Sequence, residues 1–434
     1  MSILFESLAN AFSFFGNMFS VAADLWFVLF PPALYAVFKI LWLPHVWGHY
    51  GSKIKWVLLE IIPPRDIEAS PLPMESIFAG LAGVSKGSTI AEEWVKGEFP
   101  TAFSLEIVSQ EGNVHFYIRT QTAFRNLVEA HFYAQYPNVE IVEADDYVNT
   151  VPRTLPNKDW DLWGTDFELV KPDLYPIRTY KYFEESVTGK MIDPLAGLIE
   201  TMGKAGPGQH MWLQFIIAPE KEKWYATGKA TVDEFLGKKK SEKHGVFIRL
   251  LIDLKDIFTN IFSGMLGKEM THTVLEEEKT DENGVPIESK LTFGQREVLK
   301  ALEENLGRIM FKTKMRYLYV GRRETFNKPT GVSALIGGIK QFNDQNLNSF
   351  KPNDDTKTDA KYLFVEPRLR YRQRRIFRRY VSRDSDPQFN RFELSTTELA
   401  TIFHIPDMSV VAPSLTRVAA KRGGAPSNLP IQSE

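Results

Sequence analysis

The residues best suited to chemistry in this sequence are arginines gathered in one short stretch. From Arg368 to Arg383 the chain reads RLRYRQRRIFRRYVSR, which places eight arginines among sixteen residues. Arginine pairs with phosphate through two parallel N–H bonds, so the stretch is a candidate site for a phosphate-bearing polyanion. The candidate residues are Arg368, Arg370, Arg372, Arg374, Arg375, Arg378, Arg379 and Arg383.

Apolar residues at helical spacing accompany these arginines. Leu369, Ile376, Phe377 and Tyr380 gather on one side of a helix, so the stretch is predicted to dock by that side and to present its guanidinium groups together. DNA, an anionic lipid or an acidic protein surface fits such a helix. The alternative is a solvated helix balanced by nearby acids, which are Asp354, Asp355 and Asp359.

Other kinds of chemistry find little support. The chain has no cysteine, which removes disulfides, thiol nucleophiles and cysteine-based zinc sites. No G-x-x-x-x-G-K-[ST] loop occurs, and the glycine-rich segment from Gly80 to Thr89 has the wrong spacing to cradle nucleotide phosphates. We therefore predict a non-enzyme without a catalytic, cofactor or metal site, which neither binds nor hydrolyses ATP.

Length and charge bound the remaining possibilities. A chain of 434 residues with 44% hydrophobic and 24% charged residues has an ordinary globular composition and room for two or three domains. Its formal net charge of −2 gives no overall attraction to nucleic acid. Polyanion binding must therefore come from a local patch such as the arginine stretch.

The segment that positions everything else is the apolar run from Leu25 to Leu43, LWFVLFPPALYAVFKILWL. At the helical rise of about 1.5 Å per residue it spans roughly the hydrocarbon core of a bilayer, so we predict a transmembrane helix over 21–47, kinked at Pro31 and Pro32. Residues 1–20 are predicted to form an amphipathic helix in the membrane interface. A second packed or spanning helix is the alternative for that segment.

Charges flanking this run predict its orientation. Only Glu6 and Asp24 precede it, whereas basic residues lie at or after its end, namely Lys39, Lys53, Lys55 and Arg65. The positive-inside rule then predicts a single-pass protein of the inner (cytoplasmic) membrane with the bulk of the chain in the cytoplasm.

The remaining sequence predicts an α+β fold in two units. Residues 53–147 follow the order β-α-β-β-α-β, typical of a ferredoxin-like domain. Residues 148–352 predict a second, decorated α+β domain, with a strand from Tyr180 to Ser186 and an insertion at about 238–290 that contains an amphipathic helix. Residues 353–434 contain the arginine helix, a short helix and a tail that either docks on a partner or is disordered.

Several runs in this order resemble a known family. They are LEIIPPRDIEASPLPMESIFAGL near the N-terminus, IKQFNDQNLNSFKP from Ile339 to Pro352, the arginine stretch, LSTTELATIFHIP from Leu394 to Pro406, and PSNLP from Pro426 to Pro430. Together they are similar to the membrane-anchored region before the motor domain in ATPases of bacterial type IV secretion and conjugation systems, particularly those of candidate-phylum bacteria. In that family a P-loop domain follows, whereas this sequence stops at Glu434.

The resemblance implies a membrane-anchored, non-catalytic component that positions a separately encoded motor ATPase at the cytoplasmic face of a DNA or protein transfer apparatus. The implied partners are the membrane, that motor, DNA, and further subunits of an oligomeric assembly. The alternative is a membrane protein that contacts nucleic acid or anionic lipid through the arginine stretch. A capping box at Ser395 and Glu398 predicts a short helix whose apolar residues would dock the motor, namely Leu394, Leu399, Ile402, Phe403 and Ile405.

Overall fold

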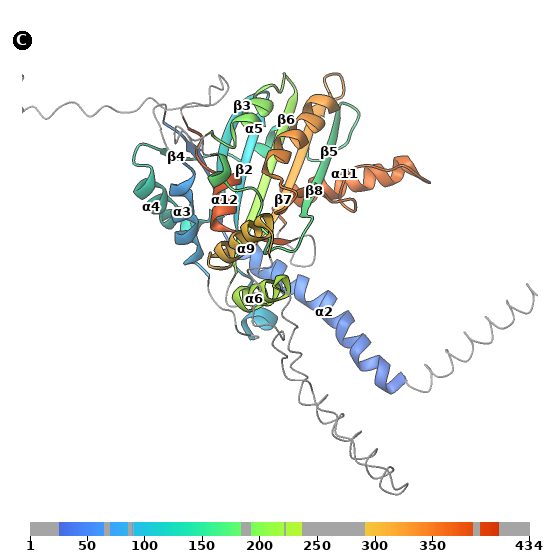
Figure 1. Cartoon of the computed structure of the whole chain (residues 1–434). Helices are drawn as coiled ribbons and strands as arrows, with labels where there is room; N and C mark the ends of the chain where they lie inside the picture. The colour runs from blue at the N-terminus through green and yellow to red at the C-terminus, as the bar shows by residue number, and fades with distance from the viewer. Residues whose placement is uncertain are drawn as a thin grey trace, which may run out of the picture.

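The computed structural model describes residues 26–64, 70–85, 89, 91–183, 192–220, 223–236, 291–384 and 391–407 (Figure 1). Three predicted segments lie outside these ranges: the interfacial helix over 1–20, the amphipathic helix of the insertion, and the tail after residue 407.

One mixed α+β body contains a single antiparallel sheet of nine strands in the order β4-β1-β3-β2-β6-β7-β5-β8, with β9 paired to β7. Their bounds are β1 Trp56–Ile62, β2 Phe103–Gln110, β3 Asn113–Gln121, β4 Glu140–Glu143, β5 Trp160–Leu169, β6 Gln209–Pro219, β7 Met310–Arg322, β8 Phe350–Pro352 and β9 Phe392–Ser395. The two predicted units therefore share one sheet rather than forming separate layers.

The first unit follows the predicted element order. Helix α3 (Leu72–Ala82) joins β1 to β2, and α4 (Arg125–Gln135) joins β3 to β4. Gly112 allows the tight β2–β3 turn because its φ of 94° is costly for other residues. The four strands pair in the order β4-β1-β3-β2, with all neighbours antiparallel.

The second unit repeats this arrangement in mirror order. Helix α5 (Ala196–Gly203) joins β5 to β6, and the strands pair as β6-β7-β5-β8. The two units meet where β2 pairs with β6 over eight residues, from Phe103 opposite Ile217 to Gln110 opposite His210. Each unit thus covers the edge strand that the other would expose.

One strand differs from the prediction. Tyr180 begins a 3₁₀ turn, Tyr180–Phe183, and the first strand of the second unit is β5. Strand β5 reads WDLWGTDFEL, and Asp166 lies buried within it. Charged residues in a buried strand conceal the alternating pattern, because their burial depends on partners from distant segments.

Alternate side chains of the sheet enter two cores. The larger core contains Leu59, Leu213 and Tyr317, and helices α3, α4, α5, α10 (Leu335–Ile339) and α12 (Thr396–Ile402) cover it. The neighbouring residues Leu58, Trp212 and Leu318 point to the opposite face. Helix α11 (Val365–Val381) and the turn Tyr147–Thr150 cover that second face.

Helix α12 corrects the predicted docking site. The capping box is present, since the Ser395 hydroxyl accepts from the Glu398 N–H and the Glu398 carboxylate accepts from the Ser395 N–H. The proposed docking residues are nevertheless all buried in the chain's own larger core, namely Leu394, Leu399, Ile402, Phe403 and Ile405. Their apolar pattern therefore reflects internal packing against α3 and leaves no face for a motor.

Helix α2 (Trp26–Lys53) projects from the body (Figure 1). It continues through Pro31 and Pro32 and exposes large apolar side chains, among them Phe38, Ile40 and Leu41. The predicted spanning segment begins at residue 21, before the described part of this helix. Among the helices that the structure describes, none combines the length and hydropathy that crossing a membrane requires.

Candidate polyanion site on helix α11

Helix α11 carries the predicted arginines and docks as expected. Its buried residues are Gln373, Ile376, Phe377 and Tyr380, which follow helical spacing. The N-terminal half extends beyond the sheet, whereas the C-terminal half packs on β5 and β7 (Figure 1). The helix therefore has one face fixed to the body and another free to meet a ligand.

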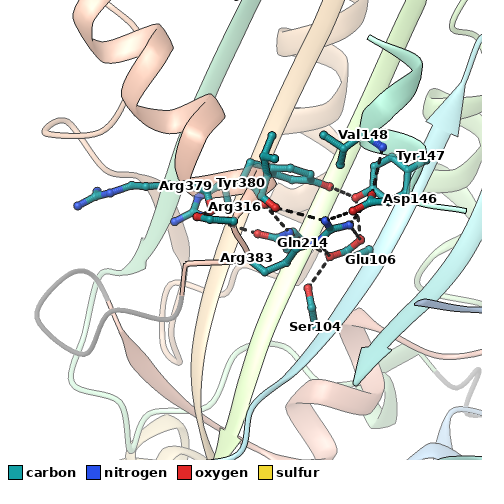
Figure 2. Close-up of polar contacts among 12 residues, drawn as sticks. Ser104, Glu106, Asp146, Tyr147, Val148, Gln214, Arg316, Arg379, Tyr380 and Arg383 are labelled. Carbon is teal, nitrogen blue, oxygen red and sulfur yellow. Dashed lines mark hydrogen bonds and ion pairs between the residues drawn. The ribbon is translucent and has the colours of Figure 1, made fainter. Parts of the chain in front are cut away.

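Arg383 fixes the C-terminal end of this helix. Its φ of 48° lies in the left-handed region, which is uncommon for a residue with a Cβ, and its side chain points beneath the helix toward the sheet (Figure 2). Nε and Nη2 donate to the carboxylate of Glu106 at 3.0 and 3.2 Å, and Nη2 donates to Asp146 at 2.9 Å. The guanidinium thus joins two carboxylates under α11.

Glu106 is completely buried and has its full set of donors. Besides Arg383, it accepts from the Ser104 hydroxyl at 2.6 Å, the Gln214 amide at 3.0 Å and the Tyr147 hydroxyl at 2.8 Å. Burial lowers the pKa of Arg383, but the charge of Glu106, the hydrogen bonds to Asp146 and Glu106 and the nearby Tyr147 together raise that pKa above its ordinary value. Arg383 therefore stays charged and neutralises a carboxylate that has no access to solvent.

A second buried arginine holds the helix by its backbone. Arg316 on β7 donates from Nε to Asp166 at 2.7 Å and from Nη1 to the carbonyl oxygen of Arg379 at 2.8 Å (Figure 2). A cation at the C-terminal end of a helix also meets the negative end of its dipole. The end of α11 is thus held by charges from two strands.

Arg372 has a structural role as well. Its Nη1 donates to the main-chain carbonyl oxygens of Asp354, Lys357 and Asp359, at 3.1, 2.9 and 2.8 Å. These bonds tie the helix to the preceding loop. The side chains of Arg372 and Arg383 therefore bind groups of the protein itself, and their assignment as ligand-binding residues was wrong.

Three exposed arginines form one row, whereas Arg368, which is also exposed, lies outside it. Arg370, Arg374 and Arg378 follow at intervals of four residues and lie along one side of α11. We call these three residues the arginine ridge. Together with Arg375 and Arg379 they line an open hollow of about 880 Å³. Burial, and then the neighbouring charge of Arg375, lower the pKa of Arg379, as expected where like charges crowd.

A second hollow lies on the other side of the ridge. It measures about 550 Å³, and Arg374 and Arg378 line it together with Arg153 and Thr154. Arg153 comes from the segment between β4 and β5, more than 200 residues before α11 in the sequence. Local spacing gave no signal for this residue, because only the fold brings it beside the ridge.

Acidic neighbours do not balance the ridge in the predicted way. The Asp359 carboxylate lies near Lys357 and Lys361, at 3.9 and 4.0 Å, and only main-chain oxygens of this loop reach α11. One acidic residue does pair with the ridge, since Oε2 of Glu366 lies 3.5 Å from Nη2 of Arg370, one helical turn later. The side chains of Arg374 and Arg378 have no hydrogen bond or ion pair with any residue that the structure describes.

A buried lysine beside the site makes stability depend on pH. The Lys314 Nζ donates to the carbonyl oxygen of Asp384 at 3.3 Å, and burial, followed by the charge of Arg316, lowers its pKa from 10.5 to about 8. The folded chain therefore holds this proton less tightly than the unfolded chain. The resulting stability is present above pH 10.5 and is lost as the pH falls through about 8.

We expect Lys314→Met to remove the rise in the free energy of unfolding between pH 8 and 10.5, because methionine has no proton to release. Urea denaturation at pH values across this window measures the effect. Lys351→Met, which alters an exposed lysine, serves as the control and should keep the wild-type slope. An unchanged slope in Lys314→Met would contradict the low pKa.

Comparison with known proteins gives a family without a known activity. A family model described as a domain of unknown function (DUF8128) matches residues 52–417. No curated protein matches the chain. The matched region begins within α2 and includes the whole sheet and α11.

Proposed function

The chain belongs to this DUF8128 family, and we propose that it is a non-catalytic binding protein whose arginine ridge holds a phosphate-bearing polyanion. The observation that carries the proposal is the exposure of two unpaired side chains, those of Arg374 and Arg378. Both residues are exposed and their side chains have no partner in the described structure, although the helix that carries them is fixed by buried ion pairs.

The electrostatic repulsion among the arginines of this helix face favours a bound anion. Several guanidinium groups held on one helix face repel one another, and a polyanion relieves that repulsion while it releases its own counterions. Because Arg316 and Arg383 already fix the helix, little of the binding energy is spent on ordering it. Hollows on both sides of the ridge leave room for successive phosphates.

The setting of this site is part of the proposal. We place the chain at the inner membrane through its N-terminal apolar segment, with the ferredoxin-like units and α11 on the cytoplasmic side. The apolar side chains exposed on α2 support this placement. The resemblance to the pre-motor region of secretion ATPases further suggests a scaffold for a separately encoded motor, within an oligomeric assembly that handles DNA or protein.

Removing the ridge tests the proposal. Arg374→Gln/Arg378→Gln should weaken binding to a fluorescent oligonucleotide and to inorganic polyphosphate by about 5- to 30-fold, as expected for two exposed charge contacts of about 0.5 to 1 kcal/mol each. The magnitude of the slope of log affinity against log salt should fall by roughly 1.4 to 1.8. Fluorescence anisotropy of the full chain in a non-ionic detergent, over a series of salt concentrations, measures both quantities.

The matched control is Lys204→Gln/Lys351→Gln, which removes the same charge from exposed, ion-paired lysines elsewhere. This control should bind like the wild type. Equal affinities and equal salt slopes for the ridge variant and the control would refute the proposal.

A further inference from the structure

The free end of α11 combines the arginine ridge with an unusual apolar tip. Tyr362, Leu363 and Phe364 precede the helix in sequence and are 79%, 81% and 78% exposed. Val365 follows them at the first helical position and is 40% exposed. Four consecutive apolar residues this open to solvent are unusual on a soluble surface and mark a site of contact.

The backbone holds this tip in an uncommon conformation. Phe364, at the N-cap of α11, has a φ of 56°, which is unfavourable for a bulky side chain. No side chain caps the helix there. Arg368 donates from Nη1 to the carbonyl oxygen of Leu363 at 3.4 Å, and the three large side chains remain exposed at the projecting end of the helix.

Charge complementarity identifies what covers the tip. Lys361 and Arg368 flank the apolar residues, and the arginine ridge follows along the same helix. Apolar residues at the end, with cations behind them, match the acyl boundary and the phosphate layer of an anionic bilayer. Tyr362 and Phe364 carry rings, but Leu363 and Val365 beside them have none to stack on a base, so the tip as a whole suits a bilayer interface better than a nucleic-acid strand.

We infer that the tip, residues 362–365, enters the interface of an anionic phospholipid bilayer while the arginine ridge contacts lipid phosphates. This inference rests on the proposed phosphate binding by the ridge and names its ligand as a membrane surface. It adds a second membrane contact to the one proposed for the N-terminal segment.

The absence of cysteine allows a specific test. Leu363→Cys in the full chain is labelled with an environment-sensitive NBD fluorophore and reconstituted into phosphatidylcholine vesicles with or without phosphatidylglycerol. We expect the emission to shift to the blue and to be quenched by doxyl-labelled lipids only in the anionic vesicles. Lys204→Cys, labelled at an exposed position on α5's C-terminal side, should show neither change.

Adding Arg374→Gln/Arg378→Gln to the labelled chain should abolish the quenching at residue 363. An unquenched label in anionic vesicles would overturn the inference, and a protein would then be the partner to test for residues 362–365. If the ridge variant still loses affinity for polyphosphate, only the membrane inference fails. If it binds polyphosphate like the wild type, the proposed function itself fails.

Discussion

Replacing Arg383 by methionine is expected to lower the free energy of unfolding by about 3 to 5 kcal/mol, the usual cost of leaving a buried charge without its partner. Methionine keeps most of the side-chain length but leaves Glu106 with no cation in contact. Urea denaturation followed by tryptophan fluorescence measures the loss, because Trp212 packs against Tyr380 at 5.5 Å between ring centroids, on the face that α11 covers.

Two further variants show whether the ion pair is responsible. Arg378→Met alters an exposed arginine of the same helix and should change stability by no more than about 0.5 kcal/mol. Adding Glu106→Gln to Arg383→Met removes the unpaired charge and should recover a large part of the loss. Equal stabilities for Arg383→Met and Arg378→Met would show that the pair does not fix α11.

Truncating Leu399 to alanine should cost about 2 to 5 kcal/mol, as for other fully buried leucines. This side chain lies in the core between α12 and α3, so its removal leaves a cavity in the folded body. A partner-docking residue would behave differently, because its loss would weaken binding and leave stability unchanged. The denaturation midpoint of the full chain decides between these two roles.

The control for this change is Leu72→Ala. Leu72 begins α3 and is 56% exposed, so the same truncation there should change stability little. If Leu399→Ala were as stable as Leu72→Ala, internal packing of Leu399 would be refuted and the docking role predicted for α12 would be favoured instead.

Local patterns were enough to predict those elements that depend on local physics. Helix α11 followed from the spacing of Ile376, Phe377 and Tyr380, since residues three and four apart share a helix face. The capping box at Ser395 predicted the start of α12 for the same reason. The first unit followed from its alternation of strands and helices.

Features that depend on distant partners were not predicted. Arg378 and Arg383 lie in the same arginine-rich stretch, and the sequence does not show which of them is exposed and which neutralises a buried carboxylate. Only the pairing of β2 and β6 places Glu106 and Gln214 under the helix. The same limit hid Arg153, which lies beside the ridge only after the sheet has formed.

The second unit shows how burial depends on such partners. Strand β5 was missed because Asp166 is buried only by virtue of its ion pair with Arg316, 150 residues later. Gly164 adds to the difficulty, since a Cβ there would lie 2.3 Å from Leu318 Cδ2 and would force that side chain to move. Glycine, a weak strand former, thus stands within a buried strand because of close packing with a distant residue.

The span of the Arg383–Glu106 pair also sets when the arginine ridge acquires its rigid support. These residues lie 277 positions apart, so a ribosome that adds about 5 to 20 residues per second reaches Arg383 on the order of 15 to 55 s after Glu106. Until then the carboxylate has no buried cation beside it, and the face under α11 cannot close. A nascent chain would therefore carry β1 to β6 well before Arg383, so the proposed phosphate-binding surface would gain its rigid support only after these strands have been made.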